Sequence, residues 1–247
     1  MFGLRPCAAS IPAAPPKKPR LLTMIFSCTS MPRPRAHAIL QIVILTTLAV
    51  LLGLALPIAA QDWQPLFDGK SLAGWRETPF TNHGKVHLQS GAIILEPGAP
   101  MTGVTLSKPP FQINYEVRFE AQRKRGGDFF ASLTFPVGDA FCTWVTGGWG
   151  GDIVGISSID GWDAAGNETR TYFSFDNERW YSFRLQVTAD RIRAWIGEEQ
   201  VVNVPIAGRE LSLRHGEIKL SAPFGFASYN TEGWLRNISW RGTSPKP

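Results

Sequence analysis

The amino-acid sequence is poor in cysteine, with 3 in 247 residues. Cys7 and Cys28 fall within the first 60 positions, and only Cys142 follows. Because a disulfide needs two cysteines, residues 61–247 cannot form one internally, which excludes a disulfide-stapled fold. Cys142 lies in the apolar run FCTWV, so we predict a buried, inert thiol rather than a reactive one.

Acidic residues are absent from the first 60 positions, which hold six Lys or Arg residues. Residues 38–56 read AILQIVILTTLAVLLGLAL, and PIAA then precedes Gln61. A basic flank, an apolar stretch and small residues predict a leader over residues 1–60, with a signal peptide or anchor at about 36–60. Cleavage near Ala60 is favoured, although about 20 apolar residues could also span a bilayer as a retained anchor. We therefore expect an exported protein, whether periplasmic, secreted or held at the membrane.

An excess of positive charge is also missing once the leader is set aside. The whole chain has 25 Lys and Arg against 20 Asp and Glu, a net charge of +5. The leader contributes six of the positive charges, so residues 61–247 carry 19 − 20 = −1. This balance gives no global attraction to phosphate or anionic lipid. We expect no nucleic-acid partner, and membrane contact only through an uncleaved N-terminal anchor.

After residue 60, no amphipathic stretch of helical period reaches twelve residues, and the pattern has period two almost throughout. In FQINYEVRFE, residues 111–120, apolar and polar residues alternate as a half-buried strand requires. Short strands separated by Gly, Pro, Asn and Asp predict an all-β domain over residues 61–247, an antiparallel two-sheet jelly-roll sandwich. The expected strands include 85–88, 92–95, 104–107, 111–120, 129–135, 141–146, 171–175, 181–187, 192–196, 200–204, 217–221 and 235–241.

Two stretches resemble a known family. Residues 63–75 read WQPLFDGKSLAGW, and residues 216–241 read GEIKLSAPFGFASYNTEGWLRNISWR. They are similar to the opening and the final strand of the 3-keto-disaccharide hydrolase domain family, and the likeness covers roughly residues 62–242. The resemblance implies a concanavalin A-like jelly roll exported by bacteria and a link to sugars oxidised at C3. It does not supply a set of catalytic residues.

Several signatures of other chemistries are missing. The E-x-D-x-x-E pattern of laminarinase-type hydrolases is absent, and Glu116 and Glu120 share a strand face about 13 Å apart, too far for a glycosidase pair. No H-x-H or C-x-x-C spacing marks a metal site, so the cofactor stays unknown and a divalent metal stays open. Asp160, Asp163 and Glu168 offer a calcium site as one alternative.

A 3-keto sugar needs fewer catalytic groups than an ordinary glycoside. Its ketone acidifies the neighbouring C–H, so the glycosidic bond can break by elimination with one base and an electrophile. His83, in the loop TNHGK, is our base candidate, with Asp152 or Asp163 assisting. A structural role is favoured for His87 and His215.

Aromatic side chains near polar groups indicate a sugar surface. In residues 147–169, GGWGGDIVGISSIDGWDAAGNET, Trp149 and Trp162 stand beside carboxylates, and flat rings match the apolar C–H faces of sugars. Trp195 shares an outward strand face with Arg193, which fits a ligand platform or cover for a packed loop. We expect a carbohydrate partner, bound either by a glycoside-cleaving enzyme or by a non-catalytic carbohydrate-binding or laminin G-like module.

Overall fold

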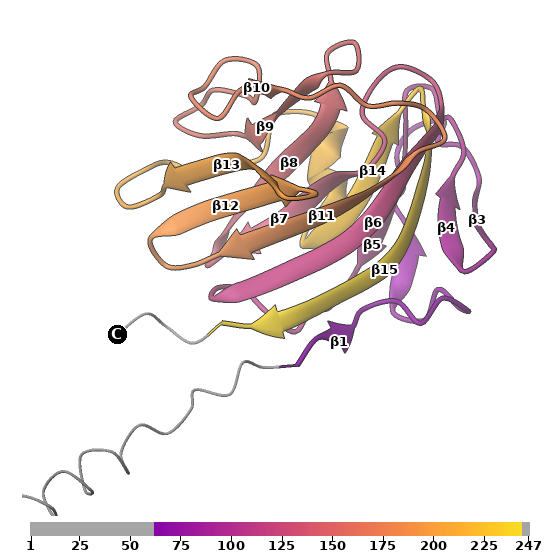
Figure 1. Cartoon of the computed structure of the whole chain (residues 1–247), viewed down its shortest axis with the longest axis horizontal. Helices are drawn as coiled ribbons and strands as arrows, with labels where there is room; N and C mark the ends of the chain where they lie inside the picture. Colours follow the sequence, from indigo (N-terminus) through magenta and orange to yellow (C-terminus); the bar gives the residue numbers. More distant parts are fainter. Residues whose placement is uncertain (1–61, 244–247) are drawn as a thin grey trace, which may run out of the picture. The chain divides into compact units, whose positions relative to one another are not determined.

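The computed structural model describes residues 62–243, which form two antiparallel sheets packed face to face (Figure 1). The predicted leader, residues 1–60, lies outside the described residues. Within residues 62–243, no helix is long and apolar enough to cross a membrane. The predicted all-β jelly-roll sandwich is therefore confirmed.

The first sheet has eight strands in the order β13-β12-β11-β6-β15-β4-β3, with β1 paired to β15. The second has seven strands in the order β10-β9-β8-β7-β14-β5-β2. The strand bounds of the first sheet are β1 Gln64–Pro65, β3 Val86–Gln89, β4 Ala92–Leu95, β6 Tyr115–Arg125, β11 Trp180–Val187, β12 Arg191–Ile196, β13 Glu199–Pro205 and β15 Glu232–Gly242. Those of the second are β2 Trp75–Glu77, β5 Met101–Leu106, β7 Ser132–Val137, β8 Ala140–Gly148, β9 Ile153–Ser157, β10 Thr171–Tyr172 and β14 Phe224–Tyr229.

The core lies between the inner faces of the two sheets. Phe119 on β6 stacks on Phe183 on β11 with ring centroids 4.9 Å apart, and both meet Trp144 of the second sheet edge to face. The alternation predicted for β11 and β12 is confirmed, because their inward rows are buried: Tyr181, Phe183, Leu185, Val187, Ile192, Ala194 and Ile196. Period two thus decides which side chains remain available on the outer faces.

Turn residues fix the ends of several strands. Ser90 and Gly91, with φ of 51° and 76°, join β3 to β4 as the sequence predicts. The strand predicted from residue 111 begins only at Tyr115, because Asn114 has a φ of 55° and bends the chain. Phe111 is still buried and its ring stacks on Tyr115 at 4.2 Å.

The strand predicted over residues 217–221 is wrong. Glu217–Ser221 forms a short 3₁₀ helix, η1, in which Lys219 donates its backbone N–H to Gly216 and Ala222 donates to Lys219. Alternating apolar residues at 218 and 220 suggested a strand, but Ile218 packs on the outside of the second sheet while Leu220 stays exposed. This segment covers the sheet instead of extending it.

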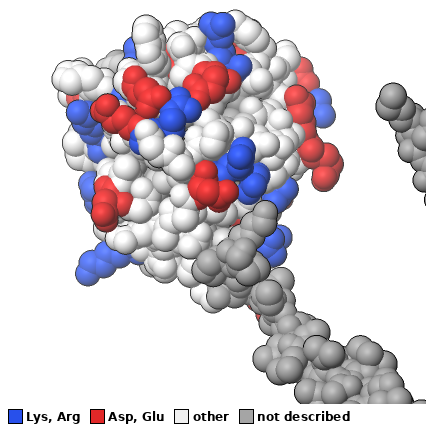
Figure 2. Space-filling model, turned by 90° about the vertical axis from the view of Figure 1, so that its left-hand side faces the viewer, with Lys and Arg blue, Asp and Glu red and all other residues white. Residues whose placement is uncertain are grey.

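Charged side chains are mixed on the surface. Viewed from the side that carries β10, β12 and β13 in Figure 1, acidic and basic side chains lie next to one another with uncharged surface between them (Figure 2). Such mixing accords with the near-zero net charge of residues 61–247.

Candidate functional site

A cleft of about 330 Å³ lies on the outer face of the seven-stranded sheet. Leu133 on β7 and Trp144 on β8 point into the core, so their neighbours Ser132 and Thr143 point outward and line the cleft, as does Ser157 on β9. Because these side chains are small, they leave space between the sheet and the loops above it. The volume lies near the lower end of the range of about 300–1,000 Å³ for ligand sites.

One end of the cleft is apolar. Its lining includes Met101, Phe129, Ile218 and Tyr229, and the rings of Phe129 and Tyr229 pack with centroids 5.5 Å apart. Ile218 comes from η1, the segment that replaces the predicted strand. This end offers a surface to the apolar side of a ligand, while the hydroxyl groups of the floor offer hydrogen bonds.

Trp149 stands at the rim of the cleft in a constrained backbone conformation. Its φ is 51°, and Gly147, Gly150 and Gly151 around it also have positive φ. Such a conformation is uncommon for a bulky residue and costs about 1–3 kcal/mol. The indole nevertheless stays 40% exposed, and the Arg214 guanidinium lies 5.4 Å from its ring centroid. The loop therefore holds an aromatic face over the cleft at an energetic cost, which is a feature of functional sites.

The two carboxylates that line the cleft are engaged by the backbone. Asp128 accepts hydrogen bonds from the N–H of Phe129 at 2.8 Å and of Gly150 at 3.2 Å, so it fastens the Trp149 loop. Glu217 accepts hydrogen bonds from the backbone N–H of Thr81, at 3.2 Å, and from its hydroxyl group. Both carboxylates are therefore committed to holding the walls of the cleft.

Besides the Tyr229 phenol, Arg214 and His215 are the ionisable groups of the cleft that are left to meet a ligand. Arg214 forms an ion pair with Asp163, with 3.5 Å between Nε and Oδ2. His215 is exposed, and within residues 62–243 no hydrogen bond orients its imidazole. The cleft thus combines a cation, an imidazole and an indole on one side of the molecule.

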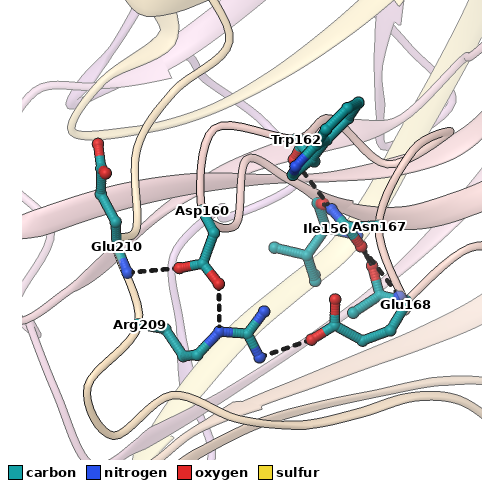
Figure 3. A network of polar contacts seen from close by, with 8 residues as sticks. Ile156, Asp160, Trp162, Asn167, Glu168, Arg209 and Glu210 are labelled. Atoms are coloured by element: carbon teal, nitrogen blue, oxygen red, sulfur yellow. Dashed lines mark hydrogen bonds and ion pairs between the residues drawn. The ribbon is translucent and has the colours of Figure 1, made fainter.

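The loop of residues 158–170 adjoins the cleft through the ion pair between Asp163 and Arg214. Arg209 fastens this loop (Figure 3). Arg209 donates to Asp160 and Glu168, both at 2.6 Å, and the backbone N–H of Glu210 donates to Asp160 at 2.8 Å. The hydrogen bonds from Glu210 and then Arg209 lower the pKa of Asp160, and the hydrogen bond from Arg209 lowers the pKa of Glu168. Both side chains therefore hold their negative charge more firmly than free carboxylates.

This network occupies the acidic residues considered as a calcium site. Arg209 bridges Asp160 and Glu168, while Asp163 turns toward Arg214. In the part of the chain that the structure describes, no group of three His, Cys, Asp or Glu side chains is placed to hold a metal ion.

The residues predicted for catalysis are separated. His83 lies in a second pocket that shares no lining residue with the cleft. There its Nδ1 contacts the Gly84 carbonyl at 2.9 Å and lies 3.8 Å from Glu77. Asp152 is exposed next to the start of β9. Of the three, only Asp163 is connected to the cleft, through Arg214.

The residues predicted to bind substrate divide between the two outer faces. Trp149 lines the cleft, and Trp162, which is 65% exposed, belongs to the bordering loop. Trp195 and Arg193 lie on β12, on the outer face of the other sheet. There the Arg184 guanidinium covers the Trp195 ring at 3.7 Å, and Arg193 donates to Gln186 at 2.7 Å. Of these four residues, the cleft therefore includes Trp149 directly, and Trp162 belongs to the loop that borders it.

The sequence interpretation missed Arg214, His215 and Tyr229 as cleft residues. They meet Trp149 because β14, which carries Tyr229, pairs with β7 in the same sheet, and because the segment before η1, which carries Arg214 and His215, lies over the outer face of that sheet. The stretch RHGE, residues 214–217, carries three of the polar cleft residues. This clustering of ionisable side chains is the feature of the sequence that could have identified Arg214 and His215 as site residues. Cys142 behaves as predicted, since burial raises the pKa of its thiol to about 12.

Comparison with known proteins gives a family for the chain. The model of the 3-keto-alpha-glucoside-1,2-lyase-like domain matches residues 62–241, which confirms the resemblance seen in the sequence. Among proteins of curated function, none matches the chain.

Solved structures share the architecture. A non-specific endo-β-1,3(4)-glucanase superposes with a TM-score of 0.50 at 8% identity, covering 75% of this chain and 97% of the other. A carbohydrate-binding module from Bacillus subtilis gives 0.48 at 12% identity, covering 68% and 96%. At 8% identity, the likeness to the glucanase shows the jelly-roll fold alone.

Proposed function

Because the chain belongs to the family of 3-keto-alpha-glucoside-1,2-lyase-like domains, we propose that it binds a 3-keto glycoside in the cleft and cleaves the glycosidic bond by elimination. The observation that carries the proposal is the meeting of Trp149, Arg214 and His215 in one cleft. An aromatic face, a fixed cation and a proton-transferring side chain are the groups that this reaction needs.

The reaction divides among these residues as follows. The His215 imidazole removes the proton from C2, which is acidic because it neighbours the C3 ketone. The electron pair forms a C1–C2 double bond through the enolate, and the bond from C1 to the glycosidic oxygen breaks. The leaving oxygen takes the proton that the imidazole removed, so atoms and charges balance. Arg214 holds the enolate oxygen while negative charge develops on it.

Trp149 and the apolar end of the cleft orient the sugar. The indole stacks on the C–H face of the ring, and the hydroxyl groups of Ser132, Thr143 and Ser157 meet its hydroxyls. No step is assigned to a metal ion, because the described residues offer no cluster of ligands for one and Arg214 supplies the positive charge.

A second candidate function is carbohydrate binding without cleavage. It is favoured by one observation, that no hydrogen bond within residues 62–243 orients the His215 ring, whereas catalytic bases are usually held by a partner. Such partners often tighten only when substrate is bound, so the two functions are separated by measuring turnover.

The decisive experiment incubates the purified protein with a methyl 3-keto-glucoside, with and without a chelator, and follows release of methanol. We expect release in both arms. His215→Ala should lower the rate by at least about 100-fold, the usual contribution of a general base. The Kd of the parent glucoside, which has no ketone and cannot undergo this elimination, should stay within about twofold.

Matched variants identify the base. His83→Ala and Asp152→Asn replace the residues first predicted from the sequence and should leave the rate unchanged. A loss of rate in His83→Ala, with His215→Ala unaffected, would return the reaction to the second pocket. Binding without turnover by the wild-type protein would establish the binding function instead.

Export is the second part of the proposal. The basic and apolar pattern of residues 1–60 supports a leader that takes the domain out of the cytoplasm. Expression of the full chain followed by cell fractionation and N-terminal sequencing tests it. Cleavage near Ala60 indicates a signal peptide, an intact N-terminus in the membrane fraction indicates an anchor, and an intact cytoplasmic protein contradicts export.

A further inference from the structure

The lining of the cleft changes in character from one side of the sheet to the other. The lining residues of its floor lie on β9, β8, β7, β14 and β5, which are neighbours in that order (Figure 1). Ser157 and Thr143 pair across β9 and β8, whereas Tyr229 and Met101 pair across β14 and β5. With neighbouring strands about 4.8 Å apart, β9 and β5 are separated by roughly 19 Å. The cleft therefore has a hydroxyl-lined end and, well away from it, an apolar end.

The apolar end rests on a small core of its own. On the outer face of the sheet, Phe80, Met101 and Ala227 form a buried cluster, and two lining residues of the cleft, Phe129 and Ile218, pack against it. This packing is present in the protein without a ligand. The surface is therefore preformed, and a ligand bound there meets little further cost of ordering side chains.

Aromatic and thioether groups line this end. The rings of Phe129 and Tyr229 have centroids 5.5 Å apart and are inclined at 48°, and Met101 lies next to Tyr229 in the sheet. Aromatic rings pack on one another in offset or edge-to-face arrangements, and a thioether sulfur makes favourable contacts with ring edges. A flat aromatic group of a ligand fits such a lining.

A second sugar ring would lose hydrogen bonds at this end. Among the described residues that form it, only the Tyr229 hydroxyl offers a polar side-chain group. The adjoining carboxylates of Asp128 and Glu217 already accept hydrogen bonds from backbone N–H groups of the protein. Because hydroxyl groups removed from water without partners are costly, the apolar end favours a group that carries few of them.

We propose that the apolar end of the cleft binds an aromatic aglycone, the non-sugar group joined to C1, so that the substrate is an aryl 3-keto glycoside. The inference rests on the proposed function of the cleft and specifies the leaving group. Held at the apolar end, the aglycone orients the sugar ring over the hydroxyl-lined floor. When the bond from C1 to the glycosidic oxygen breaks, the oxygen keeps the electron pair, and a phenolic oxygen carries that charge more readily than an alcohol oxygen.

The chemistry of the leaving group agrees with the residues around it. His215 returns to the phenolic oxygen the proton that it removed from C2, so no further acid is required. Asp128 and Glu217, the carboxyl groups of the cleft, are accordingly free to hold its walls.

The test compares three sugars in calorimetric titrations of the wild-type protein: methyl α-glucoside, phenyl α-glucoside and maltose. None has a 3-keto group, so differences in leaving-group chemistry do not contribute. Phenyl α-glucoside should bind at least about tenfold more tightly than methyl α-glucoside, because one ring is removed from water. Maltose, which would bring a second sugar to the same end, should gain no more than about twofold.

Two variants of η1 form a matched pair. Ile218 lines the cleft, whereas Leu220 is exposed and is not among the lining residues. The readout is the ratio of the Kd of methyl α-glucoside to that of phenyl α-glucoside, taken within each variant, so that a loss of folded protein cancels. Ile218→Ser should lower this ratio about 3- to 10-fold, and Leu220→Ser should keep the wild-type ratio. The wild-type titrations need no variant and decide the proposal even where Ile218→Ser does not fold.

The outcomes separate the aglycone site from the cleft. The aglycone site is overturned if phenyl α-glucoside binds no more tightly than methyl α-glucoside, or if maltose binds more tightly than phenyl α-glucoside. Equal ratios in Ile218→Ser and Leu220→Ser also overturn it. A ratio that Trp149→Ala abolishes and Ile218→Ser preserves would place the phenyl ring on the indole instead. In each case the cleft stands as long as Trp149→Ala weakens binding of methyl α-glucoside, and unchanged binding of that sugar overturns the cleft itself.

Discussion

On the outer face of the eight-stranded sheet large side chains cover one another, whereas on the outer face of the seven-stranded sheet small side chains leave a cleft. On the first face, Arg118 on β6 and Arg184 on β11 stand directly opposite each other. Two like charges in such a cross-strand pair destabilise a sheet. Arg184 lies 3.7 Å from the Trp195 ring and Arg118 4.3 Å from the Trp63 ring.

The comparison shows that tryptophan has different roles on the two faces. Trp195 has its ring covered by a guanidinium and serves the packing of the sheet surface. Trp149 stands on a loop beside a floor of serine and threonine, and Trp162 is exposed on the neighbouring loop, so both rings are open to a ligand. The neighbouring strands, rather than the residue type, decide the role.

The largest expected effect tests whether the outer face of the eight-stranded sheet serves stability alone, and it concerns Glu116 on that face. Its side chain is only 4% exposed and accepts hydrogen bonds from Arg241 and, at 2.8 Å, from Gln186. We expect Glu116→Gln to lower the free energy of unfolding by about 2–3 kcal/mol, because it removes a buried charged hydrogen-bond acceptor from partly buried donors. Urea unfolding measures this loss. Affinity for sugar in the cleft should not change; a concurrent loss of binding would show that the two faces are coupled.

The second effect fills the cleft. Val145 lines it from β8 and faces outward, so Val145→Trp places on this face the kind of side chain that covers the other sheet. The Kd for sugar should rise at least about tenfold, since the indole occupies space that the ligand needs. Calorimetric titration measures it, with Val145→Ala as the control that enlarges the cleft. Unchanged binding by Val145→Trp would exclude this cleft as the sugar site.

The third effect sharpens the comparison between the tryptophans. Trp149→Ala should weaken binding of methyl α-glucoside by about 3- to 10-fold through loss of one aromatic contact, whereas Trp195→Ala should leave binding unchanged and lower stability. Paired titrations and thermal unfolding measure both. A weaker sugar complex in Trp195→Ala would establish that ring as a ligand platform.

The smallest effect is a dependence on acid pH. Asp160 and Glu168 have lowered pKa values in the folded protein, so their contribution to the loop is present above the ordinary carboxyl pKa of about 4 and is lost as the pH falls through the lowered values. The protection of the backbone amides of residues 158–170 against hydrogen exchange should fall as the pH drops through these lowered pKa values. In Arg209→Met, the same amides should already be weakly protected at neutral pH, and their protection should change little on acidification. Equal protection of the wild-type protein and Arg209→Met would show that Arg209 does not hold the loop.

The sequence predicts the sandwich well because period two is a local property. Residues 181–187 and 192–196 place alternate side chains in the core wherever the strands pair. The pattern fails at Glu217–Ser221, where two apolar residues cannot distinguish a strand from a short helix that covers a sheet. The boundary at Asn114 was missed because a positive φ is decided by the turn as a whole.

The candidate site is less predictable because it joins distant segments. Trp149 could be identified from its glycine-rich surroundings, but His215 meets it only through the order of strands in the second sheet. His83 had the loop position expected of a base, yet it lies with Glu77 in another pocket. Residue type and local context select candidates, and only the three-dimensional arrangement chooses among them.

The sealed position of Cys142 makes the domain convenient for spectroscopic labelling. It is the single cysteine of residues 61–247, and because it is fully buried with a raised pKa, it will react slowly with maleimide reagents. A cysteine introduced at an exposed site of the 158–170 loop can therefore carry a fluorophore without background, and emission from that dye would follow ligand arrival in real time.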